Sequence, residues 1–479
     1  MTVPMEVEGP ASKPSSKYDD LLTPASTLAR TEPLTRATAS YTLHDDRFQL
    51  QQRVYDRQFA QLYFYRLLKL RPAVSASAKR RWPSCTEVRV IDAVEDVDCV
   101  LVGTLYKEMK LKPSILDEYV KDKTTQQHLG RTRFTSPDDK LVLEDEGARI
   151  VLTGPVVPTA SLVTGVVASV RGRILPSGEF CVSEICYAEL GAQPVAPPPL
   201  SLHSPGSGPQ VTRAPARYIA LTSGLGIGDA GADPLPLQLM VDYLTGALGG
   251  REEQTLASGV VRMVIAGGLL ASSAALARAG TYADARTREG ALAGLRDADA
   301  ALSQLAAALP LDVMPGEADP ANASLPQQAL HRALLPWAAA AGEGLVRASN
   351  PHEFDVEGVR FLGLSGQNVD DVVRYAELDD RTEVLEWMLR WRHMAPTSPD
   401  TLAAYPFHDR DPFVLDTCPH VFFAGNQPEF GTRMVTGEAG QRVRVVSVPA
   451  FSASPCLVLV NLDTLACHPI YFNAESMDT

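Results

Sequence analysis

The sequence predicts two folded parts in series, a small all-β barrel followed by an α/β domain. Short β-rich runs separated by Gly, Pro or Ser turns fill residues 85–192, whereas strand-like and helix-like runs alternate over residues 216–479. Residues 193–215, rich in Pro, Gly and Ser, are expected to form an extended linker between them. A chain of 479 residues is also too long for one hydrophobic core, which favours two or more domains.

Two N-terminal segments precede the barrel. Residues 1–40 are expected to form a flexible tail, because the chain is polar and contains Pro and Ser up to about Lys17. Residues 41–84 are expected to be helical, since apolar side chains recur near helical spacing over residues 48–70 and Pro72 follows as a stop signal. We expect this amphipathic helix to pack on the next domain, with docking to a partner as the alternative.

A short basic run, Lys79-Arg80-Arg81-Trp82, lies between this helix and the barrel. It fits an import or nucleic-acid patch, although three adjacent basic residues are more typical of a solvated face. The formal net charge of -13 argues against autonomous binding to nucleic acid, because clustered Lys and Arg supply most of that affinity. Proteins are therefore the expected partners.

The barrel is expected to have strands within four runs, residues 100–106, 141–152 with a turn at Gly147, 162–174 and 179–190. Short strands at this spacing fit an oligonucleotide/oligosaccharide-binding (OB) barrel. Barrels that bind single strands offer aromatic platforms and a basic groove. These runs carry few aromatic residues, and Glu144, Asp145 and Glu146 make one hairpin acidic. A protein ligand is therefore favoured, and single-strand binding is the alternative.

The α/β domain is expected to begin with alternating strands and helices. These are a strand at residues 218–221, a helix near 237–245, a strand at 261–266, an Ala-rich helix at 286–309 and a strand at Val313. In the Ala-rich helix one packing face is expected to hold Leu292, Leu295, Leu302, Leu305 and Leu309.

Familiar binding motifs do not fit the sequence. The glycine-rich run 223–229 is not directly followed by a helix N-terminus, because Asp233-Pro234-Leu235-Pro236 intervenes, so a dinucleotide site is not expected. Seven cysteines form no C-x-x-C pair, and nine histidines form no H-E-x-x-H, so a zinc site is not expected either. Without a membrane-length apolar run or a signal peptide in the first residues, a cytosolic or nuclear compartment is expected.

Several long segments resemble the B-subunits of eukaryotic replicative polymerases, and among them the small, regulatory subunits of DNA polymerase delta. The matching segments are residues 57–72, 102–116, 137–146, 162–165, 312–320, 325–328, 358–371 and 395–407. The resemblance implies the fold class α/β plus β. It consists of an inactive calcineurin-like phosphoesterase domain, a two-sheet α/β sandwich over residues 216–479, with an N-terminal OB-fold barrel.

Related archaeal B-subunits are active metal-dependent nucleases, and the resemblance implies that five loops here have lost their metal ligands. In chain order, the archaeal loops read S-D-x-H, G-D, P-G-N-H-D, a lone His and G-H-x-H. The corresponding positions in this chain are residues 223–226, 267–268, 315–319, Ser365 and 425–428. The former metal-site positions are Gly224, Gly226, Gly268, Glu317, Ala318, Ser365, Asn426 and Pro428. A two-metal site needs carboxylates and imidazoles from several loops. Loop capping and turn formation are the roles expected for Glu317, Asp319, Asn368 and Asn426.

The resemblance further implies a nuclear, non-catalytic accessory subunit without catalytic residues, metal or cofactor. Its expected partners are the catalytic subunit of DNA polymerase delta, through a Cys-rich C-terminal domain, and a third accessory subunit. The sliding clamp is expected to be reached indirectly, through the holoenzyme, and DNA only through the complex. The family also allows a translesion polymerase as a partner. Binding to a membrane is not expected. Two alternatives stay open: a metal-dependent phosphodiesterase with a rebuilt site, and a single-strand-binding OB module.

Overall fold

The structure is a computed structural model of the chain. It describes residues 34–113, 132–193, 216–229, 231–271, 285–342 and 344–472. The predicted tail up to residue 33 and the predicted linker from residue 194 to 215 lie outside the described residues. The chain divides into two units, Met1–Thr35 and Arg36–Thr479, and all that follows concerns the second. None of the described helices combines the length and apolar character that crossing a bilayer requires.

A closed five-stranded barrel forms where the β-rich runs were predicted. Its strands are β2 (Cys99–Glu108), β3 (Lys140–Glu144), β4 (Arg149–Thr153), β5 (Val167–Ile174) and β6 (Phe180–Cys186). They close in the order β2-β3-β4-β6-β5, in which only β4 and β6 run parallel. Small closed barrels are filled by inward side chains, here including Leu101, Leu143, Val170 and Phe180.

Two acidic residues of the barrel hairpin make contacts inside the molecule. The buried carboxylate of Asp145 accepts hydrogen bonds from the N–H groups of Val90 (2.7 Å), Gly147 (2.8 Å) and Ala148 (2.9 Å). Glu146 accepts a 2.6 Å hydrogen bond from Arg71. Asp145 therefore shapes the turn, and Glu146 ties the barrel to a helix.

That helix, α1 (Ala60–Arg81), lies within the predicted helical segment 41–84, but it begins and ends later than the apolar pattern over residues 48–70 indicated. Before it, the N–H groups of Leu50 and Val54 bond to Gln328 (3.0 Å) and to the hydroxyl of Tyr405 (3.0 Å), which competes with helical bonding. Pro72 lies inside the helix rather than at its end. It is exposed, as is Leu68 one turn earlier, so water can bond to the carbonyl that Pro72 leaves without a partner.

The predicted helical segment 41–84 also contains a strand. Its first residues form β1 (Tyr41–Leu43), which pairs antiparallel with β11 (His352–Val356). A short 3-10 helix, η3 (Asp45–Phe48), follows, and another, η4 (Val90–Asp92), precedes β2. The N-terminal segment therefore supplies an edge strand to a sheet of the later domain.

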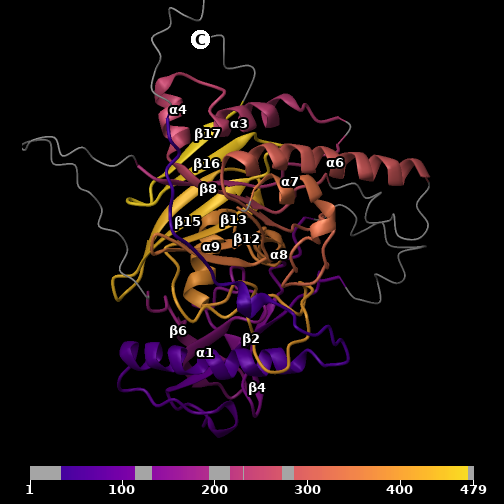
Figure 1. The fold of residues 1–479 in the computed structure, drawn as a ribbon. Helices are drawn as coiled ribbons and strands as arrows, with labels where there is room; N and C mark the ends of the chain where they lie inside the picture. Colours follow the sequence, from indigo (N-terminus) through magenta and orange to yellow (C-terminus); the bar gives the residue numbers. More distant parts are fainter. Residues whose placement is uncertain are drawn as a thin grey trace, which may run out of the picture. The chain divides into compact units, whose positions relative to one another are not determined.

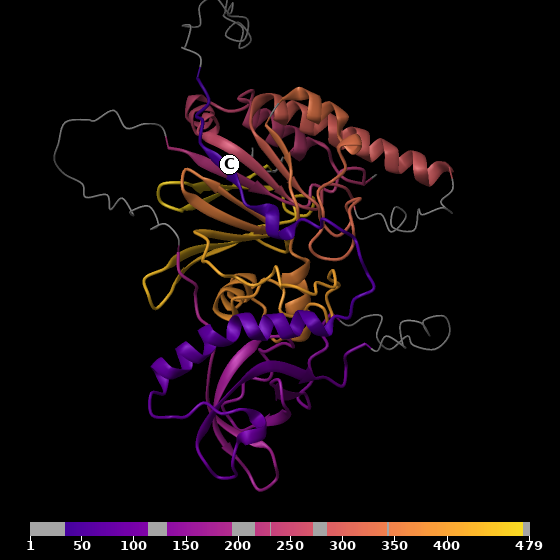
Figure 2. The same cartoon turned by 60° about the horizontal axis from the view of Figure 1, so that its bottom comes forward.

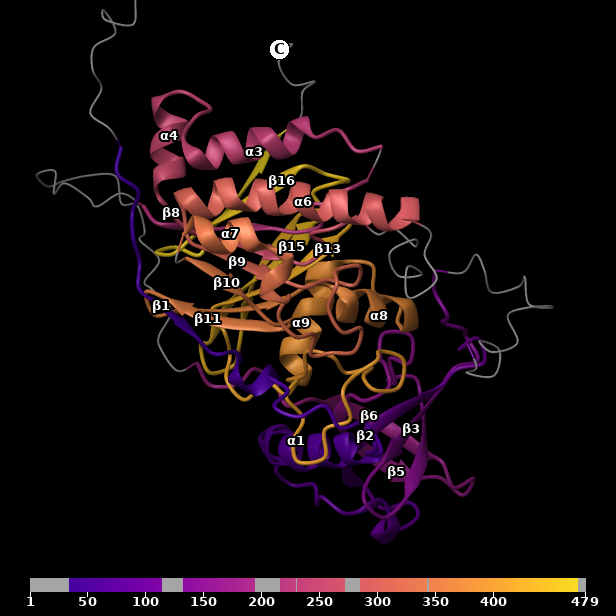
Figure 3. The ribbon, with the colours of Figure 1, turned by 45° about the vertical axis from the view of Figure 1, so that its right-hand side comes forward.

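Two six-stranded sheets lie face to face in the α/β part (Figure 3). One has the order β1-β11-β12-β13-β15-β14, with β12 (Val359–Leu364), β13 (Val421–Gln427), β14 (Gly431–Thr436) and β15 (Arg442–Pro449). The other has the order β10-β9-β8-β7-β16-β17, with β7 (Tyr218–Thr222), β8 (Val260–Ala266), β9 (Leu311–Met314), β10 (Leu345–Arg347), β16 (Cys456–Asn461) and β17 (Cys467–Tyr471). Side chains from both sheets share one core, among them Val264 and Phe423.

Helices cover the outer faces of both sheets (Figures 1 and 3). The β7–β10 sheet is covered by α3 (Leu235–Thr245), α4 (Arg251–Ser258), α6 (Ala285–Ala308) and α7 (Pro336–Ala341), with η5 (Arg332–Leu334) beside α7. The other sheet is covered by α8 (Gln367–Tyr375) and α9 (Arg381–Trp391), which share a core with the barrel. On α6, Leu302, Leu305 and Leu309 are buried as predicted, but Leu292 is 53% exposed because this end of α6 extends past α7.

Arg66 of α1 links the barrel to the α/β part through a fully buried ion pair. Its Nε lies 2.8 Å from Asp411, and both side chains are 0% exposed. Its remaining N–H groups donate to the carbonyls of Gly165 (3.2 Å) in the barrel, and of Pro396 (2.8 Å) and Ser398 (2.6 Å) in the α/β part. One guanidinium thus bonds to both parts of the molecule.

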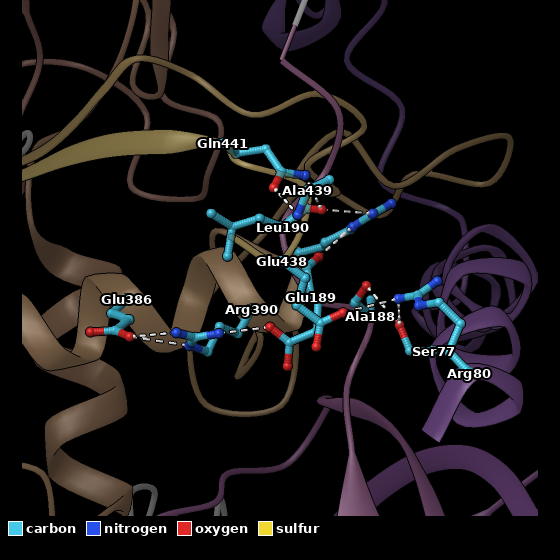
Figure 4. Close-up of polar contacts among 11 residues, drawn as sticks. Ser77, Arg80, Ala188, Glu189, Leu190, Glu386, Arg390, Glu438, Ala439 and Gln441 are labelled. Carbon is cyan, nitrogen blue, oxygen red and sulfur yellow. Dashed lines mark hydrogen bonds and ion pairs between the residues drawn. The ribbon is translucent and has the colours of Figure 1, made fainter. Parts of the chain in front are cut away.

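A second polar junction lies where the chain leaves the barrel (Figure 4). Glu189 accepts a 2.7 Å bond from Arg390 of α9, and its carbonyl accepts a 2.6 Å bond from Arg392. Gln441, near the start of β15, donates to the carbonyl of Gly191 (3.0 Å). Ser77 of α1 donates to the carbonyl of Ala188 (3.4 Å). We call residues 188–191, where the chain leaves the barrel, the exit segment. It is hydrogen-bonded to α1 on one side and to the α/β part on the other.

A buried charge cluster fastens the N-terminal segment to the sheets. His352 lies between Asp45 (2.9 Å) and Asp312 (3.3 Å), and Arg262 pairs with Asp312 on the other side. Burial disfavours the charged imidazole, but the hydrogen bonds and charges of the two carboxylates outweigh it and raise the pKa of His352 to about 9. The imidazole is therefore a cation at neutral pH.

Replacing Arg66 by Met should leave the carboxylate of Asp411 buried without the Arg66 cation. We expect the free energy of unfolding to fall by about 3–5 kcal/mol, measured by urea denaturation. The matched control is Arg80→Met on the same helix, whose ion pair with Glu438 is exposed on both sides (59% and 67%) and should change stability by less than about 1 kcal/mol. Equal losses in the two variants would contradict this role for Arg66.

The stability of the wild type should fall as the pH rises from about 6.5 to about 9. A raised pKa means that the folded protein binds the His352 proton more tightly than the unfolded chain does. Its contribution is complete below the unfolded pKa of 6.5 and is lost as the pH rises through about 9. The shift corresponds to roughly 3 kcal/mol. Denaturation at several pH values should show this slope, and His352→Gln should remove it; an unchanged slope in the variant would exclude the assignment.

Candidate functional site

The five loops of interest lie at the ends of parallel strands, and the structure brings them together. β7, β8 and β9 run parallel in one sheet, and β12 and β13 run parallel in the other. The carboxyl ends of parallel strands share an edge, so the loops of each sheet are neighbours. Contacts between Gly267 and Ser365, and between Gly268 and Asn426, join the two edges. We call this group of loops the loop centre; it consists of residues 223–226, 267–268, 315–319, 365–366 and 425–428.

Backbone hydrogen bonds close the first two loops onto each other. The N–H of Gly224 donates to the carbonyl of Gly267 (2.8 Å), and the N–H of Gly226 donates to that of Gly268 (3.1 Å). On the other side, the N–H of Ser452 donates to the carbonyl of Gly224 (2.9 Å). The loops therefore extend the β7–β8 pairing instead of opening around a ligand.

The glycines of the loop centre leave no room for a ligand side chain. Gly224, Gly226 and Gly268 have φ values of 62°, 62° and 70°, which side-chain-bearing residues rarely adopt. A Cβ on Gly268 would lie 2.5 Å from Oδ1 of Asn426 and 2.8 Å from Cα of Gly224. A Cβ on Gly316 would lie 2.3 Å from the nitrogen of Gly268. These glycines offer no side-chain ligand atom, and neighbouring atoms fill the space that a side chain would need.

Asp319 is the buried carboxylate of the loop centre, and it holds loops in shape. It is 5% exposed and accepts hydrogen bonds from the N–H groups of Gly316 (2.7 Å), Gly268 (2.9 Å), Leu269 (3.2 Å) and Leu270 (2.9 Å). Burial raises the pKa of Asp319, and the four N–H donors oppose that shift because they favour the carboxylate. Its oxygens are thus committed to the backbone.

Asn426 clamps loops of both sheets. Its side-chain amide donates to the carbonyls of Ala266 (3.1 Å) and Ser365 (2.8 Å), and its own N–H donates to the hydroxyl of Ser223 (2.7 Å). Its φ of 56° is left-handed, a conformation that Asn tolerates better than most residues. The amide of Asn368 bonds to the carbonyl of Met394.

Next to Asn426 lies a network of neutral amides that the sequence did not single out. Asn350 donates to Ser365 (2.7 Å), Gln327 (2.9 Å) and Gln367 (3.1 Å). Gln367 donates to Gln327 (2.9 Å), and Gln327 donates to the carbonyl of Gly316 (3.0 Å). Gln327 and Gln367 lie within the matching segments 325–328 and 358–371, which were the sequence signal for this network. The network ties the loops at residues 315–319 and 365–366 together without any charged group.

The remaining predicted positions lie at the margin of the loop centre. Glu317 and Pro428 are exposed, and Ala318 is half-buried. Gly226 packs near Ser452. Within the described ranges, no group of three or more His, Cys, Asp or Glu residues is placed to hold a metal ion. The buried polar side chains of the loop centre hydrogen-bond to neighbouring loops.

Comparison with known proteins gives two family matches and several full-length relatives. The family described as DNA polymerase delta subunit OB-fold domain matches residues 58–185, which confirms the predicted OB-fold. A second family, the B subunit of DNA polymerase alpha/epsilon, matches residues 219–432. The DNA polymerase delta small subunit of Arabidopsis thaliana is 40% identical, covering 92% of this chain and 97% of that protein. That of Oryza sativa subsp. japonica is 40% identical (92% and 99%), and DNA polymerase delta subunit 2 of Drosophila melanogaster is 36% identical (90% and 96%).

Gly268→Ala should destabilise the protein by about 2–5 kcal/mol. The backbone at residue 268 is left-handed, which disfavours any side chain, and the new Cβ would also clash with a neighbouring backbone. Gly178→Ala in the barrel is the matched control. Its φ of 81° carries the same backbone strain, but no atom lies within 4 Å of the new Cβ. The control should cost only about 1–2 kcal/mol. Thermal unfolding measures both, and similar losses would show that the loop centre is looser than its contacts indicate.

Proposed function

We propose a function from one premise: the chain belongs to the family of DNA polymerase delta small subunits. It is an accessory subunit of DNA polymerase delta that acts in replication and repair synthesis in the nucleus. It is non-catalytic and serves as a platform. The platform binds the Cys-rich C-terminal domain of the catalytic subunit and further accessory subunits, and through them it reaches the sliding clamp and DNA.

The α/β part is proposed to be a calcineurin-like phosphoesterase fold that has lost its site. The closed loop centre is the single observation that carries this proposal. A two-metal centre needs an open cage of carboxylates and imidazoles. Here Gly224 and Gly268 pack against each other, and the carboxylate of Asp319 is committed to four N–H groups. A fold can persist after its chemistry is gone.

The platform role is supported by the joint between the barrel and the sheets. One continuous hydrophobic core includes barrel residues such as Leu143 and α9 residues such as Leu385. Arg66 bonds to both parts, and Arg390 and Arg392 hold the exit segment of the barrel. A subunit that must present a fixed surface to several partners benefits from such a joint.

The two alternatives find less support. A rebuilt phosphodiesterase site would have to use Glu317, which is exposed, and the nearby carboxylate of Asp370 is paired with Arg381 (3.0 Å). A single-strand-binding barrel would need exposed aromatics on its strands. On the described strands β2–β6 the exposed large aromatic residue is Tyr106, at 39%. The surroundings of Glu317 therefore do not favour the phosphodiesterase, and the exposure of Tyr106 does not favour the single-strand-binding barrel.

Co-expression with the Cys-rich C-terminal domain of the catalytic subunit tests the proposal. The full chain should co-purify with it in a stable complex through affinity and size-exclusion steps at about 0.3 M salt. The control is the same chain co-expressed with the affinity tag alone. A folded chain that fails to retain the domain would argue against the platform. Hydrolysis of an aryl phosphodiester that is lost on Glu317→Ala would favour the enzyme instead.

A further inference from the structure

Helix α1 is apolar on two sides, but the described structure covers only one of them. Its inner side buries Leu62, Leu67 and Leu70 against the barrel and the α/β part. On its outer side Phe64 and Leu68 are 50% and 55% exposed. A helix that is apolar all round is normally buried all round.

The outer apolar residues form one ridge. Phe64, Leu68, Pro72 and Ala76 are four residues apart and all exposed, and Lys79 follows them at the end of the helix. We call these five residues the α1 outer face. Residues four apart form the ridge that packs into the groove of a second helix. From Phe64 to Ala76 the ridge is about 18 Å long at 1.5 Å per residue. In Figure 2 the ribbon of α1 runs across the view between the barrel and the α/β part, and no described helix or strand crosses in front of it.

The charge of α1 indicates what kind of partner fits. The helix contains no Asp or Glu, whereas the whole chain has a formal net charge of -13. Arg66 and Arg71 are used inside the molecule, by Asp411 and Glu146, and exposed ion pairs join Lys69 to Asp416 and Arg80 to Glu438. Lys79, Arg80 and Arg81 lie together at the C-terminal end and are exposed. The last turn therefore offers positive charge beside an apolar ridge.

We propose that the α1 outer face docks an acidic amphipathic helix of another subunit of the polymerase complex. This inference rests on the proposed function, because it assigns a surface to one of the expected subunits. Apolar residues on the partner would fill the groove beside Phe64, Leu68 and Pro72, and its carboxylates would face Lys79.

Two other occupants fit the α1 outer face less well. Nucleic acid would gain nothing from Phe64 and Leu68, because phosphate contacts need Lys and Arg along the whole surface. A second copy of the chain would bring an α1 of its own without any carboxylate, so the basic ends would remain unpaired. Both remain outcomes of the test.

The test is retention of subunits in the full complex. The full chain, wild type or Leu68→Glu, is co-expressed with the catalytic subunit and the third accessory subunit, and retention of each is measured on size-exclusion chromatography. We expect at least a ten-fold loss of one subunit with Leu68→Glu and an unchanged Tm. The matched control is Leu292→Glu on α6, which is exposed to a similar extent (53%) and should retain both subunits. Lys79→Glu should weaken the same subunit that Leu68→Glu loses.

Each other outcome overturns the inference. If the wild type retains both subunits and Leu68→Glu does too, the surface proposal fails while the proposed function stands. If the wild type retains neither, the proposed function fails and the inference with it. If Lys79→Glu reduces duplex DNA binding by the complex without changing subunit retention, the face contacts nucleic acid. If light scattering shows a wild-type dimer that Leu68→Glu splits, the occupant is a second copy.

Discussion

The buried guanidinium of Arg66 is the interaction on which the arrangement of barrel and sheets depends. A cation removed from water must be paired, and Arg66 is paired with Asp411 and bonded to three carbonyls. Burial and the nearby Arg66 cation lower the pKa of His393 to about 4, so this second neighbour of Asp411 stays neutral. Burial disfavours the charged form of Asp411, but His393 and Arg66 together hold its pKa well below the usual range. The cluster is thus balanced at one positive and one negative charge.

The pairing of Arg66 with Asp411 fixes where α1 can lie. The close backbone packing at Gly165 supports this position. A Cβ on Gly165 would lie 2.0 Å from the carbonyl oxygen of Pro396 and 2.6 Å from Arg66, so the barrel backbone approaches the α/β part as closely as a glycine allows. With α1 held between the two parts, its inner side joins their cores and its outer side remains facing water. The loop centre differs from this joint, because its buried polar groups are neutral amides, hydroxyls and backbone, apart from Asp319, and its other carboxylate, Glu317, is exposed.

The sequence predicts elements well where local pattern decides them, and poorly where distant contacts do. The barrel strands and the strand at Val313 follow from β-branched, period-2 runs that the barrel or sheets later bury. Pro72 suggests the end of a helix, yet it lies inside α1. Whether a proline ends a helix depends on whether its side of the helix faces water. β1 has only three residues and exists because β11 pairs with it. Such a strand has no pattern long enough to recognise.

In the loop centre, too, some features follow from the local sequence and others depend on contacts between distant residues. That Gly224, Gly268 and Ala318 carry no side chain able to bind a metal can be read from the sequence. The closure of the space cannot, because it depends on the distance between Gly268 and Asn426 after folding. The amide network was missed for a related reason: Gln327, Asn350 and Gln367 are far apart in the chain and neutral amides form no motif.

The central claim is that this chain supports a polymerase as a platform and not as a phosphoesterase. Calorimetric titration of the purified, metal-stripped chain with Mn²⁺ tests that claim most directly. The closed loop centre predicts no stoichiometric binding up to millimolar Mn²⁺. One or two Mn²⁺ bound per chain at micromolar affinity, and lost on Asp319→Asn, would contradict it.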